Sequence, residues 1–127
     1  MPAKRVLVVE DEALNRALMV ESLSDAGFQV HEAESVREAE SLLSADGYHL
    51  LITDIHMPGD ANGLDLAART HQAEPDLPIL FVTGRPDVMD QLRGAGIRGA
   101  VLPKPFALAE LVRAARALIV AAHRTTG

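Results

Sequence analysis

Short runs of apolar residues constrain the fold of this chain more than any other feature. Residues 6–9, 50–53 and 79–82 form three such runs, each too short for a helix. Runs of this length without polar alternation are typical of parallel strands that are covered on both faces. Residues 28–33 alternate between apolar and polar types, as expected nearer a sheet edge, and residues 99–102 form a weaker fifth run. The sequence therefore predicts five strands.

Segments with helix-forming composition separate these runs. Gly27 is a stop signal for the first of them, and Ser35 with Glu38 three residues later predicts a capping box at the start of the second. We expect helices over residues 13–26, 35–45, 64–71, 86–93 and 108–122. The last has the clearest helical period. The alternation predicts an α/β fold, a doubly wound (βα)5 unit with a five-stranded parallel sheet of flavodoxin-like order 2-1-3-4-5 and helices on both faces.

Composition and charge exclude several classes of function. The chain has 127 residues, 48% of them hydrophobic, so we expect one domain over residues 1–127, with its core at about 4–122 and a frayed tail at 123–127. A net charge of -6 and 3% aromatic residues argue against direct nucleic-acid binding. Without cysteine there is no disulfide or thiolate zinc site, and no apolar segment approaches the roughly 18 residues of a membrane span. We expect a cytoplasmic protein.

Acidic residues follow two of the predicted strands. Glu10 and Asp11 follow the first, and Asp54 ends the third. In the 2-1-3-4-5 order these two strands flank the switch point, where ligands bind at the carboxyl ends of the strands. Clustered carboxylates repel each other and need a cation, for which Mg²⁺ with its oxygen ligands is the natural candidate. Alternatively, the acidic run Glu10-Asp11-Glu12 caps the following helix, and Asp54 forms an Asx turn or caps the next helix.

Thr83 and Lys104 follow the fourth and fifth predicted strands. A carboxylate that attacks phosphorus needs positioning and charge neutralisation more than proton transfer, which lysine, hydroxyl and metal can supply. Asp54 would then be the nucleophile. In isolation, Lys104 could equally lie on a solvated loop, and Thr83 could form a turn at a strand end.

Together these residues resemble the receiver domain of response regulators in two-component signalling and phosphorelays. The resemblance covers residues 4 to about 122. It rests on four motifs in the family's order and spacing: Glu10-Asp11, residues 54–59, Thr83-Gly84 and residues 104–106. The resemblance implies a phosphoprotein that takes its phosphoryl group from a histidine kinase or a histidine phosphotransfer protein and controls an unknown output protein. It also implies an enzyme only toward its own phosphorylation and dephosphorylation.

The resemblance also assigns roles to individual residues. Asp54 would be the phosphoacceptor, with Asp11, Asp54 and the His56 backbone carbonyl as direct magnesium ligands and Glu10 acting through water. Lys104 would bind the phosphoryl group. Thr83 would be the switch hydroxyl, and the peptide bond before Pro105 would be cis. We also expect His56 and Arg85 to tune the phosphate lifetime, because these positions flank the route of an attacking water.

The chain departs from the family's usual pattern at three places. Val101 stands where an aromatic switch residue is common, Pro103 precedes the lysine, and the loop at residues 60–63 is one residue longer. These features are similar to receivers of hybrid histidine kinases and to some free-standing receivers, so we expect a free-standing receiver or a piece of a longer chain. Without the aromatic ring, we expect the signal to pass through the loop and helix after Thr83.

Two other functions are compatible with the same sheet topology. A flavin or nucleotide binder would need a phosphate-binding loop after the first strand, but residues 10–12 are acidic there and would repel an anion. A metal-dependent phosphatase with an aspartyl nucleophile would carry a second acid two residues after Asp54, where this chain has His56.

Overall fold

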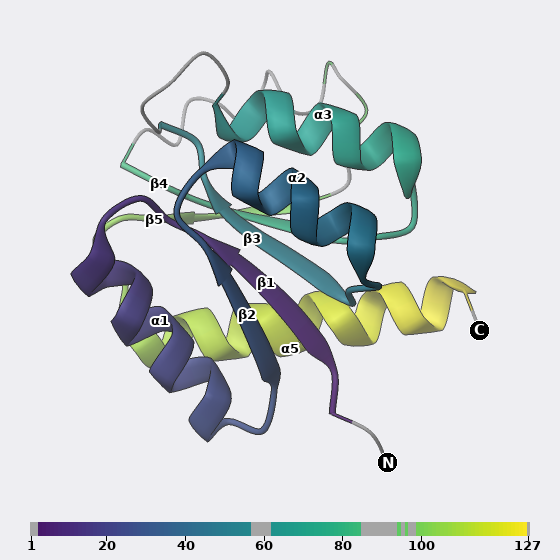
Figure 1. Ribbon diagram of the computed structural model, residues 1–127. Helices are drawn as coiled ribbons and strands as arrows, with labels where there is room; N and C mark the ends of the chain where they lie inside the picture. The colour runs from purple at the N-terminus through teal and green to yellow at the C-terminus, as the bar shows by residue number, and fades with distance from the viewer. Residues whose placement is uncertain (1–2, 57–61, 85–93, 95, 97–98, 127) are drawn as a thin grey trace.

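Five parallel strands form the centre of the molecule. The computed structural model describes residues 3–56, 62–84, 94, 96 and 99–126, with side chains as far as Ala122. The strands are β1 (Arg5–Val9), β2 (Gln29–Ala33), β3 (Leu50–Asp54), β4 (Ile79–Thr83) and β5 (Gly99–Pro103). They hydrogen-bond in the order β2-β1-β3-β4-β5, and each pairing is parallel. The α/β fold with a 2-1-3-4-5 sheet predicted from the sequence is therefore confirmed (Figure 1).

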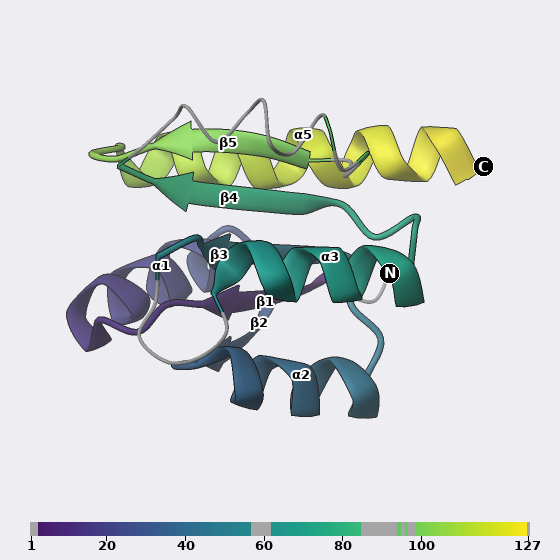
Figure 2. The same ribbon diagram turned by 90° about the horizontal axis from the view of Figure 1, so that it is seen from above.

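Helices cover both faces of this sheet. The structure describes α1 (Ala13–Asp25), α2 (Val36–Ala45), α3 (Gly63–Ala73) and α5 (Leu108–Thr126). Helices α2 and α3 lie on one face, and α1 and α5 lie on the other (Figures 1 and 2). The helix predicted over residues 86–93 lies outside the described residues. Among the described helices, none is long and apolar enough to cross a membrane.

Successive side chains along each strand point to opposite faces of the sheet, so the core consists of two apolar layers. Leu7 and Val9 of β1 pack in the layer beneath α2 and α3, whereas Val6 and Val8 pack in the layer beneath α1 and α5. All five residues of β3 are buried, as are all five of β4. Since both faces of these strands are covered, their polar residues are found where the strands end.

The starts of two helices, α2 and α3, are capped differently from the sequence prediction. The Ser35 hydroxyl accepts from the Glu38 backbone N–H at 3.1 Å, but the Glu38 carboxylate lies 3.5 Å from the Glu34 backbone N–H instead of returning to Ser35. The full capping box predicted there is therefore wrong. A reciprocal box occurs instead at α3, between Asn62 and Asp65. Because it satisfies two free N–H groups, α3 begins one residue earlier than predicted.

The last helix is longer than the sequence pattern indicated. The backbone is helical to Thr126, four residues beyond the predicted end of this helix, and the frayed tail at residues 123–127 stays a prediction. The apolar period on which the prediction rested ends at Ala122, but backbone hydrogen bonding can continue a helix without further apolar positions. Periodicity thus located the packed part of α5 and missed its end.

Candidate functional site

The carboxyl ends of four strands bring the predicted site residues to one edge of the sheet. Glu10 and Asp11 follow β1, Asp54 is the last residue of β3, Thr83 ends β4, and Lys104 follows β5. The Lys104 backbone N–H donates to the Thr83 carbonyl oxygen at 2.7 Å, which joins the last two strand ends. Glu10 and Lys104, 94 positions apart in the chain, are thus neighbours.

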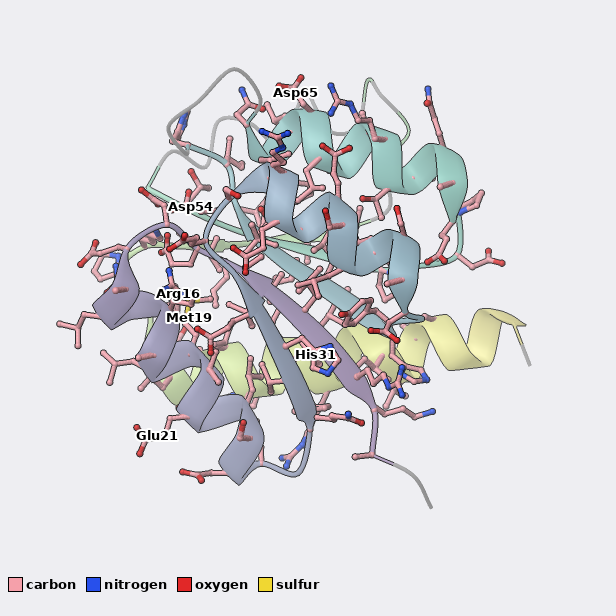
Figure 3. The ribbon with its side chains drawn as sticks, in the orientation of Figure 1. Arg16, Met19, Glu21, His31, Asp54 and Asp65 are labelled. Atoms are coloured by element: carbon pink, nitrogen blue, oxygen red, sulfur yellow. The ribbon has the colours of Figure 1, made fainter. Side chains whose placement is uncertain are left out.

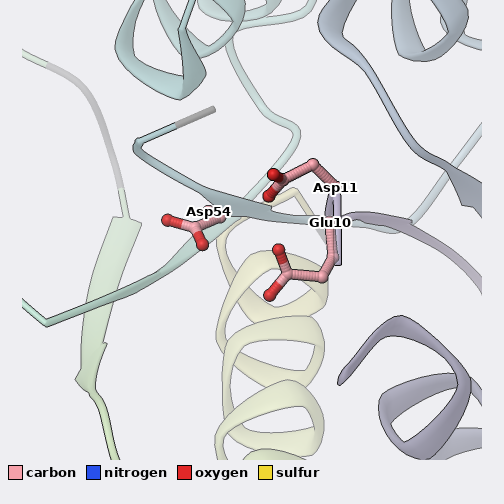
Figure 4. Close-up of side chains that lie close together, drawn as sticks. All are labelled: Glu10, Asp11 and Asp54. Carbon is pink, nitrogen blue, oxygen red and sulfur yellow. The ribbon is translucent and has the colours of Figure 1, made fainter. Parts of the chain in front are cut away.

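Three carboxylates converge at this edge. Glu10, Asp11 and Asp54 each place an oxygen within 4.8 Å of the others (Figure 4). Glu10 and Asp54 are buried, with 1% and 7% of their surface exposed, while Asp11 faces solvent. The arrangement therefore has a desolvated side formed by two acids and an open side formed by the third.

The structure describes no capping hydrogen bond between these acids and α1. Glu12 occupies the N-cap position of α1, and no side chain there accepts a capping hydrogen bond. The Asx turn considered for Asp54 does form, since its Oδ1 atom accepts from the His56 backbone N–H at 3.1 Å. Its other oxygen remains available for a different partner, so the turn orients the carboxylate without occupying it fully.

Lys104 is that second partner. Its Nζ atom lies 2.6 Å from Oδ2 of Asp54 and 3.3 Å from Oε1 of Glu10. Burial alone would lower the pKa of Lys104, but the hydrogen bond and charge of Asp54, followed by those of Glu10, outweigh it and raise that pKa. The side chain is 30% exposed, so its ammonium is held at the two acids while keeping a path to solvent.

The charge of Glu10 is only partly compensated. Burial raises its pKa, Lys104 opposes this effect, and the charge of Asp54 and a hydrogen bond with Asp11 raise the pKa further. A raised pKa means that the folded protein favours the protonated acid. This contribution to stability is fully present below the unfolded-state pKa and is lost as the pH rises through the folded-state pKa.

Replacing Glu10 with glutamine should therefore stabilise the metal-free protein at neutral pH. We expect the Glu10→Gln melting temperature in EDTA at pH 7 to exceed that of wild type by a few degrees, because the variant no longer buries a charge that Lys104 compensates only in part. The difference should shrink as the pH falls through the folded-state pKa of Glu10. Thermal unfolding followed by circular dichroism at several pH values measures it, and a lower melting temperature for Glu10→Gln at pH 7 would contradict the assignment.

The donor set suits a hard divalent cation. The three clustered side chains offer only carboxylate oxygens, and Lys104 offsets one of their three charges. Magnesium takes one or two carboxylates together with waters and phosphoryl oxygens, so this set fits it. The hydrogen bond from the His56 N–H places residue 56 beside Asp54. A ligand role for the His56 carbonyl stays a prediction.

The structure describes three of the remaining predicted residues, Thr83, Pro105 and Val101, and their roles stay predictions. Thr83 is fully buried at the end of β4, and the Lys104–Pro105 peptide bond is cis, as the resemblance implied. Val101 is partly buried in β5 and packs against the apolar layer under α2 and α3. Arg85 lies outside the described residues.

Two residues that the sequence analysis did not single out contact the site. Arg16 of α1 donates through Nη1 to the Glu10 carbonyl oxygen at 2.8 Å. Gly63, the first residue of α3, donates its backbone N–H to the Ile55 carbonyl oxygen at 2.9 Å, directly after Asp54. The only signals in the sequence were a basic residue shortly after the acid pair and a glycine in a polar loop, which are both common.

Comparison with known proteins identifies the class to which this fold and site belong. Residues 6–116 match the response regulator receiver domain family. The chain is 37% identical over 120 residues to the response regulator receiver protein CpdR of Brucella abortus, covering 94% of this chain and 99% of that protein. It is 39% identical over 124 residues to the response regulator MprA of Mycolicibacterium vanbaalenii, covering 96% of this chain and 52% of MprA.

Solved structures agree with this classification. The chemotaxis protein CheY4 of Vibrio cholerae superposes with a TM-score of 0.85 at 26% identity, covering 92% of this chain and 99% of that one. The response regulator TrrA of Thermotoga maritima, solved in complex with Mg²⁺ and BeF, has a TM-score of 0.81 at 32% identity, with coverages of 91% and 98%. The chain therefore belongs to the response regulator receiver family and is a phosphoacceptor module of two-component signalling. A flavin binder and a phosphatase are not favoured.

Proposed function

We propose that Asp54 is the phosphoacceptor and that it takes a phosphoryl group from a histidine kinase or histidine phosphotransfer protein in a Mg²⁺-dependent reaction. The observation that carries this assignment is the 2.6 Å contact between Asp54 Oδ2 and Lys104 Nζ within a cluster of three carboxylates. Asp54 is the member of that cluster that combines the lysine contact with a second, backbone hydrogen bond on its other oxygen.

In the transfer step, an Asp54 oxygen forms a bond to phosphorus while the phosphorus–nitrogen bond of the donor phosphohistidine breaks. The electron pair of the broken bond stays on the imidazole nitrogen. A carboxylate has no proton to lose when it attacks, so this step needs no general base. The His56 N–H fixes the orientation of the attacking carboxylate. Lys104 has a partly exposed side chain that can follow the transferred group and neutralise one of its oxygens. Magnesium, when bound by Asp11 and Asp54 with Glu10 acting through water, would neutralise charge on the transferred phosphoryl oxygens.

We infer that the phosphodonor docks beside α1. Leu14 and Leu18 on this helix are 66% and 42% exposed. A cavity of about 420 Å³ lies next to Leu18, which forms part of its wall together with Phe106, and the cavity reaches Lys104. An apolar helix of the donor seated on this surface would bring its phosphohistidine toward Asp54, since the cavity and the acid cluster share Lys104 and Glu10.

We also propose that the signal leaves through the loop and helix after Thr83. Phosphorylation changes the charge facing Lys104, and Lys104 is joined to Thr83 by the 2.7 Å backbone hydrogen bond. Val101 offers little surface to rearrange because a β-branched side chain has few rotamers. The responding segment, which includes Arg85, lies outside the described residues. His56 and Arg85 are proposed to tune the lifetime of the phosphate.

We propose that residues 1–127 act as one cytoplasmic domain whose catalysis is limited to its own phosphorylation and dephosphorylation. An output protein of unknown identity would read the phosphorylated state. Neither nucleic acid nor membrane is a proposed direct partner, in keeping with the net charge of -6 and the scarcity of aromatic residues.

Incubation with acetyl phosphate tests the phosphoacceptor assignment. In MgCl₂, intact-mass spectrometry should show the addition of one phosphoryl group, and peptide mapping should place it on Asp54. The same reaction in excess EDTA should give no labelled protein, because the three carboxylates then repel the incoming phosphoryl group without a cation. Labelling at another residue, or equal labelling in EDTA, would contradict the proposal. Yellow colour or turnover of small phosphate esters would instead favour the flavin binder or the phosphatase.

A further inference from the structure

Arg16 connects three elements next to the acid pair. Its Nη1 atom lies 2.8 Å from the Glu10 carbonyl oxygen and 3.5 Å from that of Asp11, and its Nε atom lies 3.1 Å from Oε1 of Glu32. The side chain is only 14% exposed. It extends from α1 at the sheet edge that carries Asp54, where both residues are labelled in Figure 3. One guanidinium thus links α1, the residues that follow β1, and β2.

The contacts fix the backbone from which the acids project. The Glu10 N–H donates to the Ala33 carbonyl oxygen at 3.0 Å, so Arg16 completes the hydrogen bonding of Glu10 from the opposite, carbonyl side. With both polar groups held, the position of the Glu10 Cα–Cβ bond is set, and that of Asp11 follows through the adjoining peptide. Groups that orient metal ligands in this way commonly change metal affinity when removed.

We propose that Arg16 is a positioning residue for Mg²⁺ binding: by holding the Glu10 carbonyl, with Glu32 as its counter-ion, it orients the Glu10 and Asp11 carboxylates toward the cation. This inference rests on the proposed Mg²⁺-dependent function. It assigns no metal ligand beyond those already proposed. What it adds is that cation affinity depends on a residue that is no metal ligand and whose described hydrogen bonds go to the Glu10 and Asp11 carbonyls and to Glu32.

The charge of Arg16 and its positioning role predict opposite changes in Mg²⁺ affinity when the residue is replaced. As a positive charge near a cation site, Arg16 opposes Mg²⁺ binding, so removing it would tighten binding if charge were its only effect. As a positioning residue, its removal weakens binding. The direction in which Mg²⁺ affinity changes in the Arg16→Met variant therefore separates the two effects, without any measurement of activity.

Magnesium titration of the full 127-residue chain, followed by backbone amide shifts in NMR spectra, provides the test. We expect the Arg16→Met variant to bind Mg²⁺ about 10-fold more weakly than wild type. Arg16→Lys keeps the charge but lacks the planar fork that reaches both a carbonyl and Glu32, so it should also bind more weakly. The matched control is Arg113→Met, which removes an exposed arginine of α5 and should leave the affinity unchanged.

A second measurement separates positioning from damage to the fold. At saturating Mg²⁺ the labelling rate of the Arg16 variants should return close to that of wild type, because every proposed ligand is still present. If Arg16→Met does not fold, the Mg²⁺ affinity of Arg16→Lys tests the proposal, since this variant has the same charge as wild type. Folded variants with wild-type or tighter Mg²⁺ binding would overturn the inference. Absence of Mg²⁺ binding or labelling in wild type would instead overturn the proposed function itself.

Discussion

The Asp54→Asn variant is expected to remain unlabelled by acetyl phosphate in the presence of Mg²⁺. Asparagine has nearly the shape of aspartate, and its side-chain oxygen can still accept the His56 N–H that now binds Oδ1 at 3.1 Å. It lacks the negative charge that attacks phosphorus and attracts the cation. The ion pair with Lys104 is lost as well. Intact-mass spectrometry should therefore show labelling reduced to background, while circular dichroism shows a folded protein.

A matched control for this variant is Asp25→Asn. Asp25 is an exposed residue at the end of α1, so its replacement removes the same charge from the chain without changing the site. This control should be labelled as fully as wild type. Full labelling of Asp54→Asn would show that another residue accepts the phosphoryl group. Loss of labelling in Asp25→Asn would show that overall charge, and not the Asp54 carboxylate, controls the reaction.

Among the proposed substitutions, Gly63→Ala is expected to lower the stability of the fold the most. A Cβ atom on Gly63 would overlap the Asp54 carbonyl oxygen and lie 2.8 Å from the Ile55 Cα and 2.9 Å from the Asp54 carbonyl carbon. These are backbone atoms and cannot rotate away, so α3 would have to move off the end of β3. We expect a loss of about 3 kcal/mol in unfolding free energy, at the upper end for overpacking. Urea unfolding measures this loss, and slower labelling should accompany it.

Gly47→Ala is the control for this substitution. A Cβ atom on Gly47 would enter open space, with no atom beyond its chain neighbours within 4 Å, and the φ angle of Gly47 is not in the left-handed region. The same chemical change should therefore alter stability by no more than about 1 kcal/mol, in either direction. If Gly63→Ala were as stable as Gly47→Ala, the close approach of α3 to Asp54 would not be a constraint on the fold.

The sequence predicted those features that depend on hydrophobic pattern and chain order. Apolar runs located the strands, and the 2-1-3-4-5 order followed from five alternating units. Because the order fixes which strand ends are adjacent, the proximity of Glu10 and Asp54 followed from residues 44 positions apart without any knowledge of side-chain contacts. The strand order therefore predicted this proximity, whereas local helix and strand propensities could not.

Other features depend on side-chain geometry that no pattern encodes. The capping box at Asn62 and Asp65 was missed because asparagine and aspartate are common in ordinary loops as well as at helix starts. The contact of Arg16 with the Glu10 carbonyl was missed because a basic residue in the first turns of a helix is common. For Gly63, the decisive fact is the distance to another strand's backbone, which composition does not report.

The parallel sheet also has a consequence for the order in which this molecule can fold. Parallel neighbours cannot be joined by a tight hairpin, so every pairing in the sheet requires a crossover of many residues. Strand β1 pairs with β2 and with β3, which begin 24 and 45 residues later. Pairings of this kind close long loops and are slow to form. Since the acids and Lys104 belong to the ends of three different strands, a partly folded chain lacks the site, and competence to receive a signal arises only when the sheet is complete.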